Sequence, residues 1–297
     1  MTDNRLPNFF IIGAAKAGTT SLYEYLRQHP DICLSYVKEP EFFSNDKLYA
    51  KGLGFYIDTY FSECTEYLVR GEASPHYLYY EKVARRIKAA LPEGDQKFLV
   101  ILRNPIERAY SLYWNMICEN HETLTFPEAI RCESTRESKA ELERDGCVRF
   151  QYADSGMYAK QLRRYFKYFD RSNFHIIYQE DLKRDAQEVL DTVFRFLGVS
   201  NWQLGERLGR FNESGQAKST ILQRLLNQPN SLKRNLGRLL PYRAKYHIVS
   251  RLLQWNKRSF TYPPMDESTR QILRETFRKD IEELASITGR DLSHWLQ

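Results

Sequence analysis

The chain has 297 residues, of which 42% are hydrophobic and 28% charged, and its formal net charge is +6. These values are ordinary for a soluble globular protein and leave room for a sizeable core. No apolar run approaches the roughly 18–20 residues that span a bilayer, and the N-terminus lacks the features of a signal sequence. We therefore expect a cytoplasmic protein without a membrane span.

The five cysteines are scattered along the chain and form no C-x-x-C pair; they are Cys33, Cys64, Cys118, Cys132 and Cys147. Their odd number and wide spacing favour buried or free thiols over disulfides or a zinc site.

The first predicted element is a buried strand at residues 9–12, which are two phenylalanines followed by two isoleucines. The small-residue loop GAAKAGTT follows at 13–20, and apolar residues then recur at helical spacing as far as Pro30. In a strand–loop–helix unit, the N–H groups of the loop and of the first helical turn point into one concavity, with the positive end of the helix dipole behind them. This stretch therefore predicts a phosphate site.

The loop differs from the phosphate loop of ATPases, G-x-x-x-x-G-K-S/T. Gly13 and Gly18 have the right separation, but Thr19 stands at the lysine position, and the only lysine is Lys16 inside the loop. Because the missing lysine is the one that reaches the β- and γ-phosphates, a magnesium triphosphate is disfavoured. Lys16 can instead reach a single 5′-phosphate and the atom bonded to it. For the loop taken alone, a structural turn with a solvated lysine is the alternative.

The other predicted elements alternate between strands and helices along most of the chain. Strands are predicted at 32–35, 67–75, 97–103 and 174–178, and helices at 52–61, 81–91, 106–118, 155–169, 182–197 and 265–287. The uninterrupted apolar run KFLVIL at 97–102 is typical of a strand buried on both faces of a parallel sheet. This order predicts an α/β fold, a P-loop-like parallel sheet flanked by helices. We expect a single domain at 1–297, with its core at about 7–221 and a helical C-terminal part at 222–297.

Two stretches fit less well. Residues 119–146 are polar and charged, which suggests a helical or mobile excursion over the sheet edge, and residues 227–264 are basic and aromatic with weak helical periodicity.

Charged and polar side chains follow the predicted strands, at the edge of the sheet where ligands of α/β proteins bind. In strand order they are Lys16; Lys38 and Glu39; Glu72, Ser74 and His76; and Arg103, with Ser111 in the next helix. The set holds cations for more than one phosphate and a carboxylate that could take a proton from a hydroxyl.

Several of these segments resemble the sulfotransferases that use 3′-phosphoadenosine 5′-phosphosulfate (PAPS). KAGTTSL at 16–22 resembles their 5′-phosphosulfate loop, and LRNP at 102–105, running on to Ser111, resembles their 3′-phosphate element. KEPEFF at 38–43 resembles the segment with the catalytic glutamate in the glycosaminoglycan branch. Residues 156–181 and SGQAKS at 214–219 are similar to the same branch. The resemblance covers about 7–221.

The chain departs from that family at three positions. Ala73 stands where the heparan sulfate 3-O-sulfotransferases have a lysine, Glu41 where they have a histidine, and Gln216 where a basic residue is usual. Lys218 is left as the cation of the late loop.

The resemblance implies direct transfer of a sulfuryl group from PAPS to a hydroxyl of a carbohydrate or glycosylated small molecule, without a metal, leaving 3′-phosphoadenosine 5′-phosphate (PAP). In such transfers positioning and charge stabilisation dominate. Lys16 would stabilise the charge left on the 5′-phosphate, and Glu39 would accept the hydroxyl proton. The implied nucleotide-binding residues are Lys16, Ala17, Gly18, Thr19, Thr20, Ser21, Arg103, Ser111 and Lys218. The implied acceptor-side residues are Glu41, Glu72 and His76.

Each assignment also has a structural alternative. Glu39 could form a surface ion pair with Lys38, Arg103 could pair with a carboxylate, and His76 could be an ordinary loop residue held by hydrogen bonds.

Two other functions stay open from the residues alone. A nucleotide kinase would need a magnesium-binding acid at a strand end, where this chain has Arg103. A protein that binds a polyanion without catalysis would use the region 204–258, which has twelve Lys or Arg and two acidic residues. No nucleic-acid motif accompanies this charge, so a nucleic-acid partner is not expected. The sequence does not indicate an oligomeric state.

Overall fold

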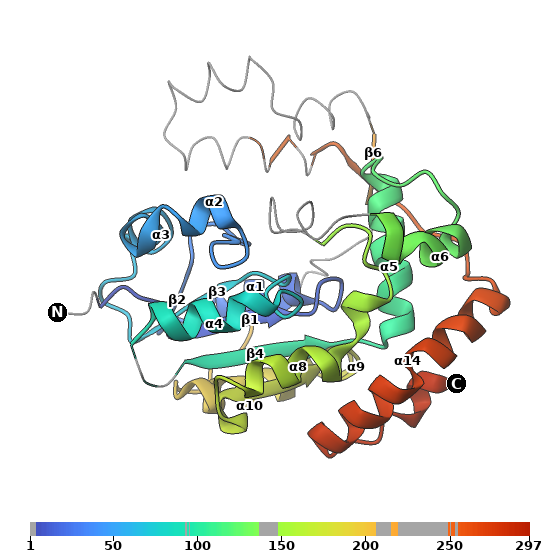
Figure 1. The fold of residues 1–297 in the computed structure, drawn as a ribbon. Coiled ribbons are helices and arrows are strands. Elements are labelled where there is room, and N and C mark those ends of the chain that lie inside the picture. The colour runs from blue at the N-terminus through green and yellow to red at the C-terminus, as the bar shows by residue number, and fades with distance from the viewer. Residues whose placement is uncertain are drawn as a thin grey trace.

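A parallel five-stranded sheet with the order β2–β3–β1–β4–β5 forms the centre of the protein (Figure 1). The strands are β1 (Phe9–Gly13), β2 (Ile32–Leu34), β3 (Val69–Ala73), β4 (Lys97–Leu102) and β5 (Phe174–Tyr178). This computed structural model describes residues 4–92, 94, 96–136, 148–205, 215–218, 249, 251–252 and 255–297. The predicted α/β fold is confirmed.

Two of the three interior strands, β1 and β4, have the composition that complete burial requires. All residues of β1 are buried, and β4 is buried from Phe98 onward. Phe9 is aligned with Gly71 of β3, and a Cβ atom at Gly71 would lie 2.3 Å from the Phe9 ring. A glycine is therefore needed where this ring crosses the neighbouring strand.

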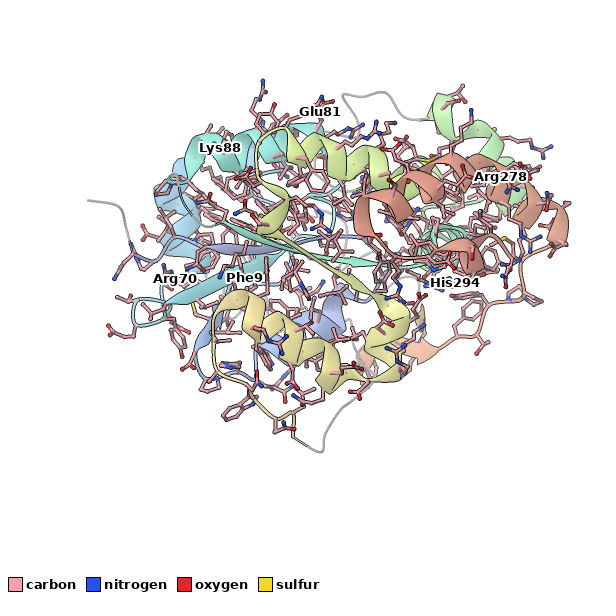
Figure 2. The ribbon with its side chains drawn as sticks, turned by 90° about the horizontal axis from the view of Figure 1, so that it is seen from below. Phe9, Arg70, Glu81, Lys88, Arg278 and His294 are labelled. Carbon is pink, nitrogen blue, oxygen red and sulfur yellow. A yellow bond between two sulfur atoms is a disulfide. The ribbon has the colours of Figure 1, made fainter. Side chains whose placement is uncertain are left out.

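Helices cover both faces of the sheet (Figure 2). On one face lie α4 (Glu81–Ala90) and α8 (Tyr158–Phe166), which contact each other. On the other face lie α1 (Thr19–Leu26) and α10 (Ala186–Leu197), where the His29 ring lies 4.7 Å from the ring of Phe194. This arrangement leaves the carboxyl edge of the strands for the loops that carry the polar residues.

The structure describes further helices and short turns around this core. They are α2 (Asp46–Tyr49), α3 (Gly52–Tyr60), α5 (Pro105–Cys118), α6 (Phe126–Arg136), α9 (Gln179–Arg184) and α14 (Glu267–Thr288), with the 3₁₀ turns η1 (Asp154–Gly156), η2 (Arg171–Asn173) and η3 (Ser293–Leu296). The helix predicted at 182–197 is divided, because Asp185 has extended backbone and caps α10 by accepting from the Glu188 N–H. Helix α14 confirms the one predicted at 265–287. It buries an apolar stripe that includes Leu273, Phe277 and Ile281.

Strand β6 (Gly215–Ala217) pairs antiparallel with β7 (Lys257–Ser259), so part of the predicted late loop is a strand. Most of the stretch 227–264 and residues 137–147 lie outside the described residues. None of the helices that the structure describes is both long and apolar enough to cross a membrane.

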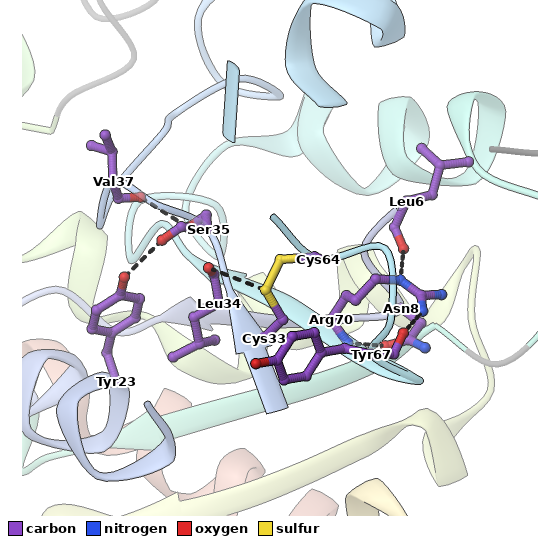
Figure 3. The surroundings of a disulfide bond; sticks show 10 residues. All are labelled: Leu6, Asn8, Tyr23, Cys33, Leu34, Ser35, Val37, Cys64, Tyr67 and Arg70. Carbon is purple, nitrogen blue, oxygen red and sulfur yellow. Dashed lines mark hydrogen bonds between the residues drawn. A yellow bond between two sulfur atoms is a disulfide. The ribbon is translucent and has the colours of Figure 1, made fainter. Parts of the chain in front are cut away.

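A disulfide joins Cys33 in β2 to Cys64, which follows α3 (Figure 3). The two Cα atoms are 5.6 Å apart, although 31 residues separate the cysteines in sequence. The prediction of free or buried thiols was therefore wrong for this pair. The positions of the cysteines in the sequence do not reveal this pairing, because it depends on α3 returning the chain to the edge strand β2. Cys118 and Cys132 carry free thiols, and Cys147 lies outside the described residues.

Candidate active site at the carboxyl edge of the sheet

The loop between β1 and α1 has the shape of an anion cradle. Lys16 and Gly18 both have left-handed backbone, with φ of 68° and 111°. Helix α1 begins directly afterwards at Thr19, and among the described residues no side chain caps it. The N–H groups of its first turn are therefore available to a ligand oxygen. Ala17 is completely buried and can contribute only its backbone, whereas Thr20 and Ser21 are half-buried in the first turn.

The two predicted phosphate elements lie next to each other. The Arg103 guanidinium, after β4, donates to the backbone carbonyl of Lys16, with Nη1 and O 3.4 Å apart. The Arg103 side chain is 18% exposed, and the Glu107 carboxylate lies 3.9 Å away. Lys16 and Arg103 therefore share one part of the sheet edge and could contact two phosphates of one nucleotide.

Helix α5 supplies the third side of this site. Asn104 caps it by accepting from the Ile106 N–H, with Pro105 at its first position. Ser111 is buried on the helix, and Asn115 lies one turn further on. The Asn115 Oδ1 atom accepts from the Lys16 ammonium at 2.7 Å. Sequence reasoning missed Asn115; its only signal is the four-residue step from Ser111.

Glu39 lies in the loop that follows β2. It pairs with Lys38, and its backbone N–H donates to the Ala73 carbonyl at 3.0 Å, which ties the loop after β2 to the end of β3. Burial alone would raise the pKa of Glu39, but the positive charges of Lys38, His76 and Lys16 outweigh it and hold the pKa below its ordinary value. The side chain is 39% exposed, so an acceptor can reach the carboxylate.

Glu72 lies beneath this surface and is completely buried. Its carboxylate accepts from the hydroxyls of Tyr56 and Ser74, both at 2.6 Å, and of Tyr77 at 2.9 Å. Burial and the charge of Glu41 raise the pKa of Glu72 to about 7, although these hydrogen bonds act to lower it. All of these partners belong to the protein, so the geometry makes Glu72 a support for the loop above it.

Glu41 and His76 connect that support to the surface. The Glu41 N–H donates to Ser74 Oγ at 3.1 Å, and the Ser44 hydroxyl donates to the Glu41 carboxylate. The same carboxylate pairs with His76 Nδ1 at 3.1 Å. The three predicted acceptor-side residues therefore belong to one connected cluster.

Lys218 lies at the end of β6, and this strand contacts α5 (Figure 1). Its backbone N–H donates to the Asn256 carbonyl at 2.6 Å, and its ammonium lies 5.7 Å from the Trp255 ring centre. Contact between Lys218 and a nucleotide stays a prediction. Within the described ranges, no cluster of three or more His, Cys, Asp and Glu side chains is arranged to bind a metal ion. Independence of metal likewise stays a prediction.

The sequence matches the family described as "Sulfotransferase domain" over residues 6–228. The chain belongs to the sulfotransferase family. The resemblance inferred from the loop at 16–22 and the turn at 102–105 is thereby confirmed.

Two mammalian relatives match this sulfotransferase over most of its length. It is 28% identical to the mouse bifunctional heparan sulfate N-deacetylase/N-sulfotransferase 1 over 314 residues, which is 100% of this chain and 31% of that protein. It is 32% identical to the human protein of the same name over 67% of this chain and 23% of that protein. The sulfotransferase thus spans less than a third of either relative.

A solved structure agrees with the fold over nearly the whole chain. The sulfotransferase from Alicyclobacillus acidocaldarius is 28% identical and superimposes with a TM-score of 0.70, covering 98% of this chain and 99% of that one.

Proposed function

We propose that this sulfotransferase transfers the sulfuryl group of PAPS to a hydroxyl of a carbohydrate or glycosylated small molecule. The proposal depends chiefly on one contact, from the Arg103 guanidinium to the Lys16 carbonyl. It brings the loop suited to a 5′-phosphate against the cation suited to a second phosphate, while Glu39 lies close enough for the Lys16 charge to lower its pKa.

The residues present fit the donor. The uncapped N–H groups at the start of α1, with Thr19 and Thr20, would hold the 5′-phosphate, and Arg103 and Ser111 would hold the 3′-phosphate. Ser111 follows Arg103 on the adjoining helix, so both can face one ribose. This second phosphate would distinguish the donor from ATP.

Charge stabilisation and one proton transfer complete the reaction. Glu39 would take the proton as the acceptor oxygen forms its bond to sulfur and the bond from sulfur to the 5′-phosphate breaks. Lys16 would stabilise the electron pair that stays on that phosphate. Base catalysis of this kind is typically worth about 10²–10⁴-fold in rate.

The names of the mammalian relatives support a carbohydrate acceptor. Both are heparan sulfate N-sulfotransferases, but the chain matches only part of them. Neither rival function is favoured, because Arg103 stands where a kinase needs an acid and the family match covers residues 6–228.

Differential thermal stabilisation tests nucleotide choice. PAP should raise the melting temperature far more than magnesium ATP at equal concentration, because a ligand that binds the native state stabilises it. Lys16→Ala should reduce transfer from labelled PAPS at least 100-fold, and Glu39→Gln should do the same while keeping the shift with PAP. Lys167→Ala, at an exposed lysine after α8, serves as control and should retain full activity.

An equal response to both nucleotides would favour a kinase, and no response to either would favour polyanion binding. Full turnover by Glu39→Gln would remove Glu39 from the mechanism.

A further inference from the structure

Lys16 is held at two points by the segment that follows β4. Its backbone carbonyl accepts from the Arg103 guanidinium at 3.4 Å, and its ammonium donates to the Asn115 Oδ1 atom at 2.7 Å. A lysine ammonium ends a flexible stem of four carbons, which has many rotamers to choose from. The hydrogen bond to Asn115 therefore restricts where this ammonium lies.

The Asn115 amide is oriented in its turn by Glu119. Its Nδ2 atom donates to Glu119 Oε1 at 2.9 Å, one turn further along the chain. An ionised carboxylate can only accept, so the amide presents its nitrogen to Glu119 and its oxygen to Lys16. Glu119 is the C-cap residue of α5, and its side chain is 38% exposed. The three side chains thus form a chain of hydrogen bonds with one direction.

An asparagine at this position orients the Lys16 ammonium without neutralising it. The amide is an uncharged acceptor, whereas an aspartate of the same shape would form an ion pair and cancel much of the field of the ammonium. Asn115 also lies in the last turn of α5, where the negative end of the helix dipole favours a nearby cation. The lysine therefore offers its charge to a ligand from a defined place.

The same face of α5 carries Ser111, which the proposed function assigns to the 3′-phosphate. Ser111 and Asn115 are four residues apart, so they lie on one face of the helix, about 6 Å apart along its axis. The helix that would hold the 3′-phosphate thus also holds the ammonium that would meet the 5′-phosphate.

We propose that Asn115, oriented by Glu119, is a positioning residue that places the Lys16 ammonium against the oxygen from which the sulfuryl group departs. This inference rests on the proposed function and adds two residues that do not contact the reacting atoms. In the transfer the acceptor oxygen bonds to sulfur, the bond from sulfur to the 5′-phosphate oxygen breaks, and its electron pair stays on that oxygen. A charge already in place stabilises this oxygen without reorganisation during the reaction.

The experiment measures transfer of the labelled sulfuryl group from PAPS, both to the best acceptor of a glycan panel and to water. Asn115→Ala should lower kcat about 10-fold or more while the KM for PAPS changes less than about 3-fold, because a small displacement of a catalytic group mainly affects the transition state. Alanine is a strong helix former, so α5 should remain folded.

Asn173→Ala is the matched control. Asn173 is also half-buried and also donates through its side chain, to the Gln96 carbonyl at 3.1 Å. It precedes β5 and so lies at the amino edge of the sheet, opposite the site. This variant should keep the wild-type kcat.

A double-mutant cycle with Lys16→Ala separates positioning from a structural role. If Asn115 acts through Lys16, Asn115→Ala should change the rate less than about 2-fold in the Lys16→Ala background. Glu119→Ala should lower kcat by a smaller factor than Asn115→Ala, and Glu119→Gln should restore it, because a glutamine oxygen can still accept from Asn115. The isosteric Asn115→Asp should lose at least as much as Asn115→Ala, because its carboxylate neutralises the ammonium.

The shift of the melting temperature by PAP shows which variants are folded and bind nucleotide. The inference is overturned if Asn115→Ala shows the normal shift and keeps the wild-type kcat, or if its loss is as large in the Lys16→Ala background as in the wild type. Either result would leave the proposed function intact. Should Asn115→Ala not fold, a wild-type kcat in Asn115→Asp would overturn the inference instead. No transfer from PAPS by the wild-type protein, to any glycan or to water, would overturn both proposals.

Discussion

Glu72 lies at the end of β3 without exposed surface, and three hydroxyls donate to its carboxylate. Burial raises its pKa from an ordinary 4.5 to about 7. A carboxyl group whose pKa rises on folding binds its proton more tightly in the native state than in the unfolded state. Its contribution to stability is therefore complete below about pH 4.5 and is lost as the pH rises through about 7.

This linkage predicts a measurable difference between wild type and Glu72→Gln. A pKa difference of this size corresponds to on the order of 3 kcal/mol in the free energy of unfolding. The wild-type free energy minus that of Glu72→Gln should fall by this amount between pH 4.5 and pH 8, because glutamine does not titrate. Urea denaturation across that range measures it. Glu66→Gln, at an exposed position, is the control and should show the same pH dependence as wild type. A difference in the free energy of unfolding between wild type and Glu72→Gln that does not change with pH would contradict the raised pKa.

Residues near strand ends could be predicted from the sequence, whereas their partners mostly could not. Lys16, Glu39 and Arg103 follow apolar runs, and parallel strands bring such positions to one edge. Asn115 of α5 contacts Lys16, from which it is 99 residues distant in sequence, and Tyr56 of α3 contacts Glu72 of β3. These contacts depend on how α5 and α3 pack, which helical periodicity does not specify.

At the scale of elements, β2 is a three-residue edge strand that depends on cross-links for its position. Cys33 is bonded to Cys64, and the Ser35 N–H donates to the Gly71 carbonyl at 2.8 Å. Tyr23 donates to the Ser35 carbonyl, and Ser35 to that of Val37 (Figure 3). The segment that leads to Lys38 and Glu39 is thus held at several points.

Loss of the disulfide should destabilise the protein by about 3–4 kcal/mol, because the bond closes a loop between cysteines 31 residues apart. Urea denaturation with and without reductant measures this, and the double variant Cys33→Ser, Cys64→Ser should equal the reduced wild type. Cys118→Ser, at a free thiol, should respond to reductant as wild type does. A non-reducing peptide map in which Cys33 and Cys64 are both alkylated would contradict the bond.

The cross-link also bears on where the protein works. Disulfides persist in oxidising compartments and are rare in the cytosol. Cys33–Cys64 therefore counts against the cytoplasmic location expected from the sequence, and that location stays a prediction.

Periodicity predicted the long elements better than their boundaries and pairings. The apolar runs of β1 and β4 and the stripe of α14 needed no tertiary information. The break between α9 and α10 depends on the backbone of Asp185, and the pairing of β6 with β7 joins segments about forty residues apart. Short strands of this kind carry too few residues to show a period.

At the scale of the whole molecule, the segment after α14 returns to the nucleotide side. The Asn104 side chain donates to the Trp295 carbonyl at 3.1 Å, and the Trp295 indole donates to Glu180 at 3.2 Å. Arg290 pairs with Glu180 and Asp181 of α9. Trp295 is almost completely buried, so this segment braces the turn that presents Arg103.

Trp295→Ala should therefore lower both stability and nucleotide affinity. Loss of a buried tryptophan costs about 3–5 kcal/mol, measurable by urea denaturation. A looser Asn104 should raise the Kd for PAP severalfold at a temperature where the variant is folded, as calorimetry would show. Trp202→Ala is the matched control, because that ring is 39% exposed and lies against His29. It should cost less and keep the Kd, and an unchanged Kd in Trp295→Ala would remove the bracing role.

The crossing of the Phe9 ring over Gly71 limits how this sheet can evolve. Any side chain at 71 meets the ring, and overpacking a core typically costs about 1–3 kcal/mol, whereas a smaller residue at 9 alone leaves a void. A substitution at either position alone is thus unfavourable, and only a change at both positions restores the packing of the core. Descendants of this sequence should therefore inherit the two residues together or replace both, which ties the first strand to the third as one unit of variation.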